Sequence, residues 1–565
     1  MQNIDWFVLI FTLLVIVVYG TIKTRGAVTA NEYIKAGNNA KWWTIGLSVM
    51  ATQASAITFL STPGQAYNDG LGFVQFYFGI PIAIVIVCTV FIPIYHKLKV
   101  YTAYEFLESR FDLKTRSLTA VLFLIQRSLS AGITIFAPAI ILSTVLGWDL
   151  LTLNIIIGSL VIIYTVSGGT KAVNYTQKYQ MGIILFGLIT VLYIIISLLP
   201  DNINFDNALK IASVNSKMEV LNFSFDLENR YTVWSGILGG TFLMMSYFGT
   251  DQSQVQRYLS GKSLKEMQLG MIFNGVFKIP MQFFILFIGV MVFVFYQFNH
   301  SPLNFNPQGK KIISETIYES HYKYLENRLE DNFEEKKIVI NDFLETNNKL
   351  SKEKIDLLSY EEKEIREAAK LIIKRAAEKK QIKIETNDKD YVFINFILDN
   401  LPKGLIGLLL AVILSAAMSS TSSEINALAT TTSIDILKRN FSKVNDTNIV
   451  YYTKLMTLFW GLCAIGIACV AYLADNLIQL VNIIGSIFYG NVLGVFLIAF
   501  FIKHIKSNAV FISAIITQII IIFAWYYDWM PFLWLNVFGC FVVIIISSFT
   551  QEIIQKLKFF RPLRN

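Results

Sequence analysis

The sequence contains few of the residues that stabilise secreted domains or operate enzymes. Its four cysteines all stand inside apolar runs, which favours packing roles over a disulfide framework. Its four histidines fall at the ends of apolar runs or in one polar segment, which argues against a buried proton relay or metal site. Spaced constellations of His, Asp and Cys are also missing, so we expect no enzymatic activity.

Charged residues are scarce as well. They make up 16% of the 565 residues, against 54% hydrophobic residues, which is too apolar for a soluble domain. We therefore expect an all-α polytopic protein in a lipid bilayer, with about thirteen apolar runs able to span it. No basic region precedes the first run, which favours a retained span over a cleaved signal. The expected spans lie near residues 4–22, 42–66, 72–95, 117–145, 150–167, 178–199, 232–250, 266–297, 401–422, 450–473, 476–502, 507–526 and 530–550.

The net charge of +8 does not predict nucleic-acid binding. Basic residues outside the polar segment gather in short connections between spans, where they indicate which side of the membrane is cytoplasmic. Their alternation predicts an N-terminus outside and a C-terminus in the cytoplasm. Examples are Lys35 and Lys41 after the first span, Lys97 and Lys99 after the third, and Lys438 and Arg439 after the ninth.

Two expected spans contain residues that weaken a helix. The second has a dense polar and Pro/Gly segment from Gln53 to Gly64, and the seventh carries Gly239, Gly240 and Ser246. The two spans are five apart, as expected if two five-helix repeats of opposite topology each begin with an interrupted helix. This pattern is typical of alternating-access transporters.

Hydroxyl groups are concentrated in the ninth span, between Leu414 and Asn426. Sodium prefers oxygen ligands, and hydroxyls can combine with carbonyls that a broken helix leaves free. Ser419 and Ser420 could therefore bind a cation together with carbonyls around Ala51 and Ala54. The alternative is that small residues simply allow close helix packing here.

Two basic residues lie deep inside apolar runs. Arg127 and Lys278 are functional candidates, because a charge inside a membrane span is costly without a role. The alternatives are that Arg127 extends to the membrane surface and that Lys278 pairs with a carbonyl.

A charged insertion, 299–390, separates the eighth and ninth spans and is expected outside the membrane. Opposite charges at helical spacing predict roughly two or three solvated helices. We interpret it as a structural accessory or a docking site for an extracytoplasmic partner. For the protein as a whole, a transporter-like membrane sensor is an alternative to a transporter, because the insertion could act as a receptor.

Several motifs together resemble the sodium:solute symporter family, which includes sodium-coupled sugar, monocarboxylate, multivitamin and sialic-acid carriers. The motifs are Leu47-Ser48 through Phe59, Thr102 to Leu107 with Arg110-Phe111, Gly168 to Val173, Asp251-Gln252 with Gln256-Arg257, and Ser419-Ser420 with Asn426 and Asp435. The resemblance implies a LeuT-type five-plus-five inverted repeat and sodium-coupled import of a small organic solute by alternating access. It implies one Na⁺ bound by the carbonyls of Ala51, Ala54 and Ala416 and the hydroxyls of Ser419 and Ser420.

A second sodium site is not expected, because Gln177 stands where some relatives have an aspartate. The sugar-binding positions of the family correspond to Thr58 and Tyr77, which disfavours a sugar. Ser55 and Thr58 match positions that hold a carboxylate in sialic-acid carriers. The favoured substrate is therefore a carboxylate-bearing solute, such as a monocarboxylate, a sialic acid or a vitamin-like acid, and a sugar is the alternative. The expected substrate-binding residues are Gln53, Ser55, Thr58, Phe73, Tyr77, Arg127, Tyr247 (as an inner gate) and Lys278.

The predicted division of the chain follows from these features. It comprises a first transmembrane helix with its cytoplasmic loop (1–40), a first inverted repeat (41–200), the start of a second repeat (201–298), the extracytoplasmic insertion (299–390), the rest of the second repeat (391–503), and C-terminal helices with a cytoplasmic tail (504–565).

Overall fold

The computed structural model describes residues 2–24, 29–226, 228–314, 316–381, 384, 386–471 and 477–560. These residues form helices, and the isolated bridge between Ala40 and Gly261 is the sole strand-like pairing among them. The expected all-α class is confirmed. Parts of the predicted terminal segments, 25–28 and 561–565, lie outside the described residues.

Most helices follow one another with short connections, and the connection 215–234 between α10 and η4 is a long one. They are α1 Asn3–Thr24, α2 Ala30–Lys35, α3 Trp42–Gln53, α4 Ala56–Asp69, α5 Ile80–Ile86, α6 Ile92–Leu98, α7 Glu105–Arg110, α8 Leu113–Leu146, α9 Leu150–Ser197, α10 Phe205–Val214, α11 Gly240–Gly249, α12 Gln252–Leu259, α13 Leu264–Phe295, α14 Pro307–Ile313, α15 Glu319–Thr346, α16 Lys349–Lys379, α17 Lys389–Asn400, α18 Leu405–Thr431, α19 Lys438–Asn440, α20 Ile449–Val470, α21 Leu477–Phe501, α22 Ser507–Tyr526 and α23 Phe532–Phe560. Shorter 3₁₀ or π turns are η1 Ala36–Asn38, η2 Gly70–Tyr77, η3 Val87–Phe91, η4 Ser235–Gly239 and η5 Thr432–Leu437.

Membrane-spanning length is reached by nine helices within the described ranges, and a bent pair in α9 makes a tenth. The predicted count of about thirteen is therefore not confirmed. Some expected spans correspond to helices that are short or interrupted, such as α3 and α11. A multi-pass membrane protein is nevertheless clear from the repeated apolar helices.

The second expected span is broken, as predicted. The helix α3 ends at Gln53, and α4 begins at Ala56. Between them, Ala54 and Ser55 have non-helical backbone angles, with ψ of 77° and 172°. The last carbonyls of α3 consequently lose their partners within the helix and become available to other groups.

The break in the second repeat occurs at a different place from the glycines that drew attention to it. Gly239 and Gly240 lie in the continuous helix formed by η4 and α11, and the chain leaves helical geometry at Thr250 and Asp251. Asp251 then caps α12 by accepting a hydrogen bond from the Ser253 amide. The glycines instead allow close packing, because a Cβ on Gly239 would lie 2.9 Å from the Leu533 carbonyl oxygen and a Cβ on Gly240 would lie 2.9 Å from the Phe76 carbonyl oxygen.

The two predicted spans 150–167 and 178–199 both lie in α9. Gly169 bends this helix with φ of 53° and ψ of −151°, a conformation that favours glycine. A Cβ at this position would also lie 2.7 Å from the Tyr33 carbonyl oxygen, so α9 passes very close to α2 here.

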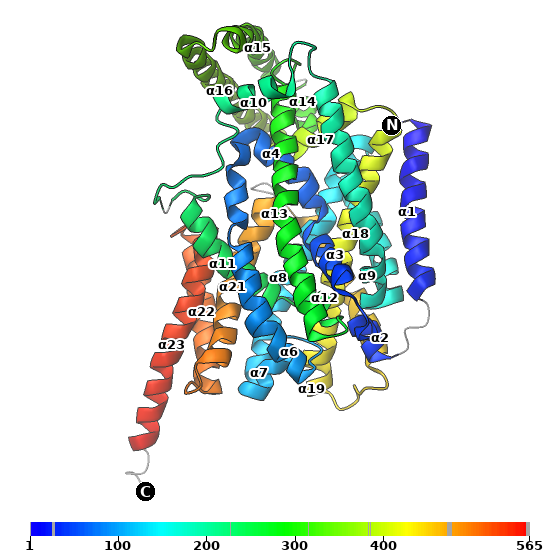
Figure 1. The fold of residues 1–565 in the computed structure, drawn as a ribbon, viewed down its shortest axis with the longest axis vertical. Helices are drawn as coiled ribbons and strands as arrows, with labels where there is room; N and C mark the ends of the chain where they lie inside the picture. The colour runs from blue at the N-terminus through cyan, green and yellow to red at the C-terminus, as the bar shows by residue number, and fades with distance from the viewer. Residues whose placement is uncertain are drawn as a thin grey trace.

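The insertion forms a long helical hairpin, α15 and α16, preceded by α14. Figure 1 shows it projecting from one end of the bundle, the end at which the N-terminus also lies, while the C-terminus lies at the opposite end. The hairpin is more than a pair of solvated helices, because it has its own apolar core. The core contains Leu303, Ile312, Ile313, Tyr322, Leu325, Leu329, Ile365, Ala369, Ile372, Ile373, Ala376, Ala377 and Ile384.

The middle of the hairpin is joined to the bundle by partly buried polar contacts. Glu362 binds Lys336 at 3.1 Å and Arg366 at 3.0 Å, and Arg366 donates a hydrogen bond to the Pro302 carbonyl at 2.8 Å. A further ion pair of 2.9 Å joins Lys389 of α17 to Asp69 of α4. The insertion is thus connected to the outer end of the interrupted helix.

Candidate functional site

A cavity of about 100 Å³ lies inside the bundle, beside the break between α3 and α4. It is small compared with common ligand pockets. Most of the predicted substrate-binding residues line it: Gln53, Ser55, Thr58, Tyr77, Arg127, Tyr247 and Lys278. Phe73 does not line the cavity, since it stacks behind Phe76 with ring centroids 5.6 Å apart.

The predicted sodium ligands lie where α18 packs against the broken helix. The Ser419 hydroxyl donates to the Ala51 carbonyl at 3.2 Å, and the Ser420 hydroxyl donates to the Ala416 carbonyl at 3.0 Å. Ala54 lies in the break itself and is fully buried. These are uncharged oxygen donors, which fit a hard monovalent cation.

Gln177 of α9 reaches into the same cluster of oxygens. Its amide nitrogen donates to Ser419 Oγ at 2.8 Å, and to Thr52 Oγ1 and Ser423 Oγ at 3.1 Å each. Its carbonyl oxygen accepts a hydrogen bond from Ser48 at 2.5 Å. The hydroxyl oxygens around Gln177 are therefore occupied by a neutral donor from the protein itself.

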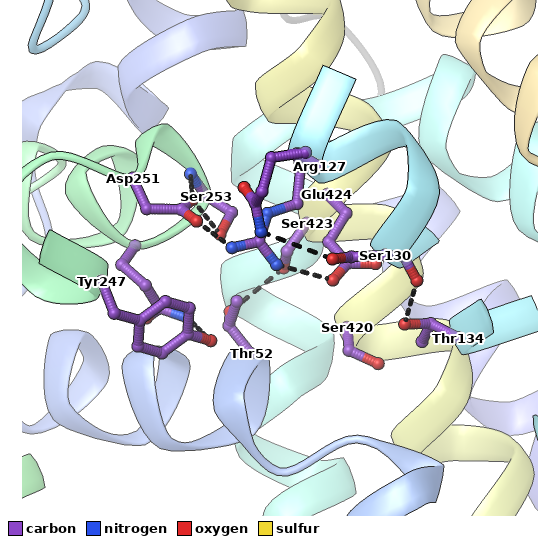
Figure 2. A network of polar contacts seen from close by, with 12 residues as sticks. Thr52, Arg127, Ser130, Thr134, Tyr247, Asp251, Ser253, Ser420, Ser423 and Glu424 are labelled. Carbon is purple, nitrogen blue, oxygen red and sulfur yellow. Dashed lines mark hydrogen bonds and ion pairs between the residues drawn. The ribbon is translucent and has the colours of Figure 1, made fainter. Parts of the chain in front are cut away.

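A buried charge network closes one side of the cavity (Figure 2). Arg127 of α8 binds Glu424 of α18 at 3.0 Å and also pairs with Asp251 at the break between α11 and α12. The Tyr489 hydroxyl of α21 lies 2.6 Å from Arg127 and donates to Asp251 at 2.8 Å. Arg127 is 3% exposed, so its guanidinium does not extend to the membrane surface. It connects four elements instead.

Lys278 of α13 has a different environment. It is 1% exposed and lines the cavity, yet its ammonium makes no hydrogen bond or ion pair with any described residue. The pairing with a carbonyl that we considered from sequence is not seen. An unpaired ammonium is costly in a buried site, so the cavity offers a place for an anionic group.

Tyr247 of α11 lines the cavity next to the charge network. Its hydroxyl accepts a hydrogen bond from Gln254 at 2.5 Å, and its ring lies 5.7 Å from the Arg127 guanidinium. The ring therefore lies between the cavity and the second helix break, where an inner gate would have to act.

Sequence reasoning missed two residues of this site. Glu424 is a carboxylate inside an apolar span, only four positions after Ser420, and that alone should have marked it as a functional candidate. Tyr489 carried no such signal, because a tyrosine in an apolar run is usually a packing residue.

The geometry defines the class of protein before any relative is considered. Two interrupted helices meet beside an intramembrane cavity with polar and charged walls, which is the arrangement of a secondary transporter. Comparison with known proteins agrees. The model of the sodium:solute symporter family matches residues 33–326 and 368–517, and the chain belongs to this family.

The chain is similar to several characterised transporters. It is 27% identical over 490 residues to the sodium-coupled monocarboxylate transporter 1 of Mus musculus, covering 87% of this chain and 67% of the relative. It is 24% identical over 563 residues to the sodium/sialic acid symporter SiaT of Proteus mirabilis (strain HI4320), covering 98% of this chain and 96% of the relative. The human sodium/iodide cotransporter is 31% identical over 271 residues, covering 48% of this chain and 42% of the relative.

The fold is also found among solved structures. A Na⁺-coupled sialic acid symporter in a substrate-bound, outward-open state superimposes with a TM-score of 0.74, at 23% identity and 98% coverage of both chains. This likeness confirms the expected LeuT-type fold.

Proposed function

We propose that this protein imports a small carboxylate-bearing solute together with sodium by alternating access, and that it catalyses no reaction. The observation that carries the proposal is Lys278, a buried ammonium that lines the cavity and has no partner among the described residues. A carboxylate would supply the missing counter-charge, and charge-assisted hydrogen bonds are the stronger kind. The Ser55 and Thr58 hydroxyls, which also line the cavity, would donate to the same carboxylate.

A neutral sugar fits this cavity less well. Several sugar hydroxyls would need matching polar partners, and they would leave the Lys278 ammonium without a counter-charge. The names of the relatives point the same way, since they include monocarboxylate and sialic acid carriers.

In this proposal sodium binds between the carbonyls of Ala51, Ala54 and Ala416 and the hydroxyls of Ser419 and Ser420. The ion would hold the broken helix α3–α4 against α18 and so stabilise the conformation with high substrate affinity. Entry of one positive charge across 100 mV supplies about 2.3 kcal/mol of driving force in addition to the sodium gradient.

We also propose the topology expected from the basic connections, with the N-terminus and the insertion outside and the C-terminus in the cytoplasm. The predicted division into repeats follows this topology. The bundle would contact lipid, and the insertion would remain available to an extracytoplasmic partner.

Uptake by purified protein in proteoliposomes tests the proposal. With an inward sodium gradient, labelled propionate, lactate, sialic acid, alanine and glucose are compared, and carboxylate accumulation should require the gradient. Lys278→Met should abolish it, whereas Lys265→Met, at an exposed position on the same helix, should not. Sodium-driven accumulation of glucose alone would overturn the proposal.

A further inference from the structure

Three metal-ligating side chains gather on the insertion, outside the membrane-spanning helices. They are His300, in the segment that follows α13, and Glu330 and Glu334, one turn apart on α15. His300 Nδ1 lies 3.0 Å from Glu330 Oε2, and one ligand atom of each of the three residues lies within 4.8 Å of the other two. All three side chains are exposed, unlike the buried metal site that the sequence argued against.

The backbone holds His300 in place from both sides. Before it, the Phe298 amide donates to the Phe295 carbonyl at 3.1 Å, which keeps the chain turned on the end of α13. After it, the Arg366 guanidinium of α16 donates to the Pro302 carbonyl at 2.8 Å. The imidazole is therefore carried by a segment whose backbone is anchored at both ends.

A ring contact directs the imidazole onto α15. The ring centroids of His300 and Phe333 are 4.5 Å apart, with an angle of 49° between the planes. Phe333 comes three residues after Glu330 and directly before Glu334, and residues at i, i+3 and i+4 share one face of a helix. The imidazole thus lies over the face that carries both carboxylates, and His300, Glu330 and Phe333 line a cavity of about 250 Å³ there.

The charge of this group favours a cation. Two carboxylates at i and i+4 repel each other and destabilise the helix. Glu334 forms no ion pair or hydrogen bond with any described residue, and Glu330 pairs with the imidazole. The ammonium of Lys337 lies 5.6 Å from the Phe333 ring and pairs with neither glutamate in the described chain. A divalent ion between the two carboxylates would compensate both charges.

The donor set selects the metal. Imidazole nitrogen suits zinc, copper and nickel, whereas calcium and magnesium require six or more oxygen ligands. Zinc takes four ligands, so one nitrogen and two carboxylate oxygens would leave the fourth position to water. Ligand atoms in a tetrahedral zinc site are about 3.4 Å apart. The present separations can reach that value by side-chain rotation, because the His300 and Glu330 side chains are 59% and 56% exposed.

We propose that His300, Glu330 and Glu334 form a binding site for one divalent transition-metal ion, with zinc as the best match. The ion would join α15 to the end of α13 and so fix the insertion against the bundle. The site shares no residue with the cavity beside the broken helix. The proposal is therefore independent of sodium and of the transported solute, and its failure would leave the proposed function untouched.

Zinc binding is measured on the full-length protein, with any affinity tag removed and bound metal stripped by EDTA. Isothermal titration gives the affinity and the stoichiometry, and thermal unfolding reports the stabilisation of the folded state by the bound ion. One zinc ion per chain should bind and raise the unfolding midpoint, whereas magnesium and calcium at the same concentration should not. Absence of zinc binding, or an equal shift with magnesium, would overturn the site.

Single substitutions assign the ligands. Glu334→Gln removes a carboxylate that has no partner among the described residues, so it should leave the fold intact and weaken zinc binding at least about tenfold. His300→Gln should weaken binding as much. Glu335→Gln and His321→Gln are the controls, because they remove the same groups at exposed positions of α15 outside the site. Unchanged affinity in the first two variants, or equal weakening in the controls, would overturn the assignment.

Hydrogen exchange tests whether the ion joins the two elements. Saturating zinc should slow amide exchange in residues 299–303, since the imidazole would then be tied to α15. The slowing should appear in the unmodified protein and not in Glu334→Gln. Zinc binding without any slowing in this segment would overturn the proposed link between α13 and α15.

Discussion

Ser419 and Ser420 are adjacent, but their hydroxyls contact different elements. Ser419 bonds across to the Ala51 carbonyl of the broken helix, whereas Ser420 bonds within its own helix. If both bind sodium, Ser419→Ala and Ser420→Ala should each raise the sodium concentration for half-maximal uptake about tenfold, by loss of one ligand. Ser548→Ala is the matched control, because its hydroxyl also donates four residues back, to the Ile544 carbonyl at 2.9 Å, but outside the site. The measurement is uptake as a function of sodium concentration. If the sodium concentration for half-maximal uptake is unchanged in both variants, Ser419 and Ser420 are not sodium ligands.

Gln177 determines how many sodium ions we expect to be transported with each substrate molecule. Its amide nitrogen lies within hydrogen-bond distance of the hydroxyl oxygens of Thr52, Ser419 and Ser423 and supplies no negative charge there, so we predict one sodium per substrate. Reversal potentials in proteoliposomes measure this ratio directly. Gln177→Asp would replace the donor by a carboxylate among these hydroxyls and should move the ratio towards two. A ratio near two in the unmodified protein would show that these oxygens bind a second ion despite Gln177.

For single residues, the sequence predicted which side chains line the cavity. It did not predict which other residues those side chains contact. Lys278 and Arg127 were both identified by a simple cost, a charge inside an apolar run. Their different environments could not be predicted, because the partners of Arg127 are 124 and 297 positions away along the chain. Such pairs depend on how helices pack, which no local pattern encodes.

Between helices, close packing of backbones constrains the broken span. Gly64 of α4 lies so near α17 that a Cβ would be 1.8 Å from the Lys389 carbonyl oxygen. Gly64→Ala should therefore lower stability by about 2 kcal/mol, as expected for overpacking against backbone that cannot yield. Gly182→Ala in α9 is the control, because a Cβ there meets nothing within 4 Å. Thermal unfolding of the purified protein compares them, and equal midpoints would show that α4 and α17 can separate without cost.

The two helix breaks show what composition can predict for an element. The first was correctly located because polar residues interrupt an apolar run at the break, beginning with Gln53, whereas Pro63 lies inside the continuous helix α4. The second was not, because Gly239 and Gly240 serve close packing while the break lies at Thr250 and Asp251. A glycine pair weakens a helix, but neighbouring helices can keep it helical.

For the molecule as a whole, attachment of the insertion should depend on pH. Burial raises the pKa of Glu362, but Lys336 and Arg366 outweigh burial and lower it to about 2. A lowered pKa contributes stability that is fully present above the ordinary value near 4.5 and is lost as the pH falls towards about 2. Glu362→Gln should cost about 1–2 kcal/mol at pH 7, since the side chain is only partly buried. The cost should shrink as the pH falls from about 4.5 towards 3.

Glu361→Gln is the control for this prediction. Glu361 pairs with Arg328, but both side chains are 42% exposed, so its removal should change stability little. Thermal midpoints of both variants between pH 7 and 3 provide the measurement. Equal effects of the two variants, or a constant effect of Glu362→Gln across that range, would contradict a stabilising ion group formed by Glu362, Lys336 and Arg366.

The sequence also predicted the insertion's place and helical character, but not its core. Its charges stood at helical spacing, and that pattern indicates exposed faces without revealing which apolar residues meet between helices. The expected number of spans failed for a related reason. Apolar runs measure hydrophobic length, whereas breaks such as the one after Gln53 divide that length into pieces too short to count.

The hairpin is held against the bundle near its tip as well as near its ends, which makes it a brace and not a free arm. Val339, Ile340, Ile355 and Leu358, towards the tip, belong to the same apolar core as the membrane-spanning helices, and the Ser359 hydroxyl donates to the Asn215 side-chain oxygen at 3.0 Å. Lys389, in the helix that follows the hairpin, pairs with Asp69 of α4. A tilt of the outer half of the broken helix would therefore have to displace contacts of the whole insertion.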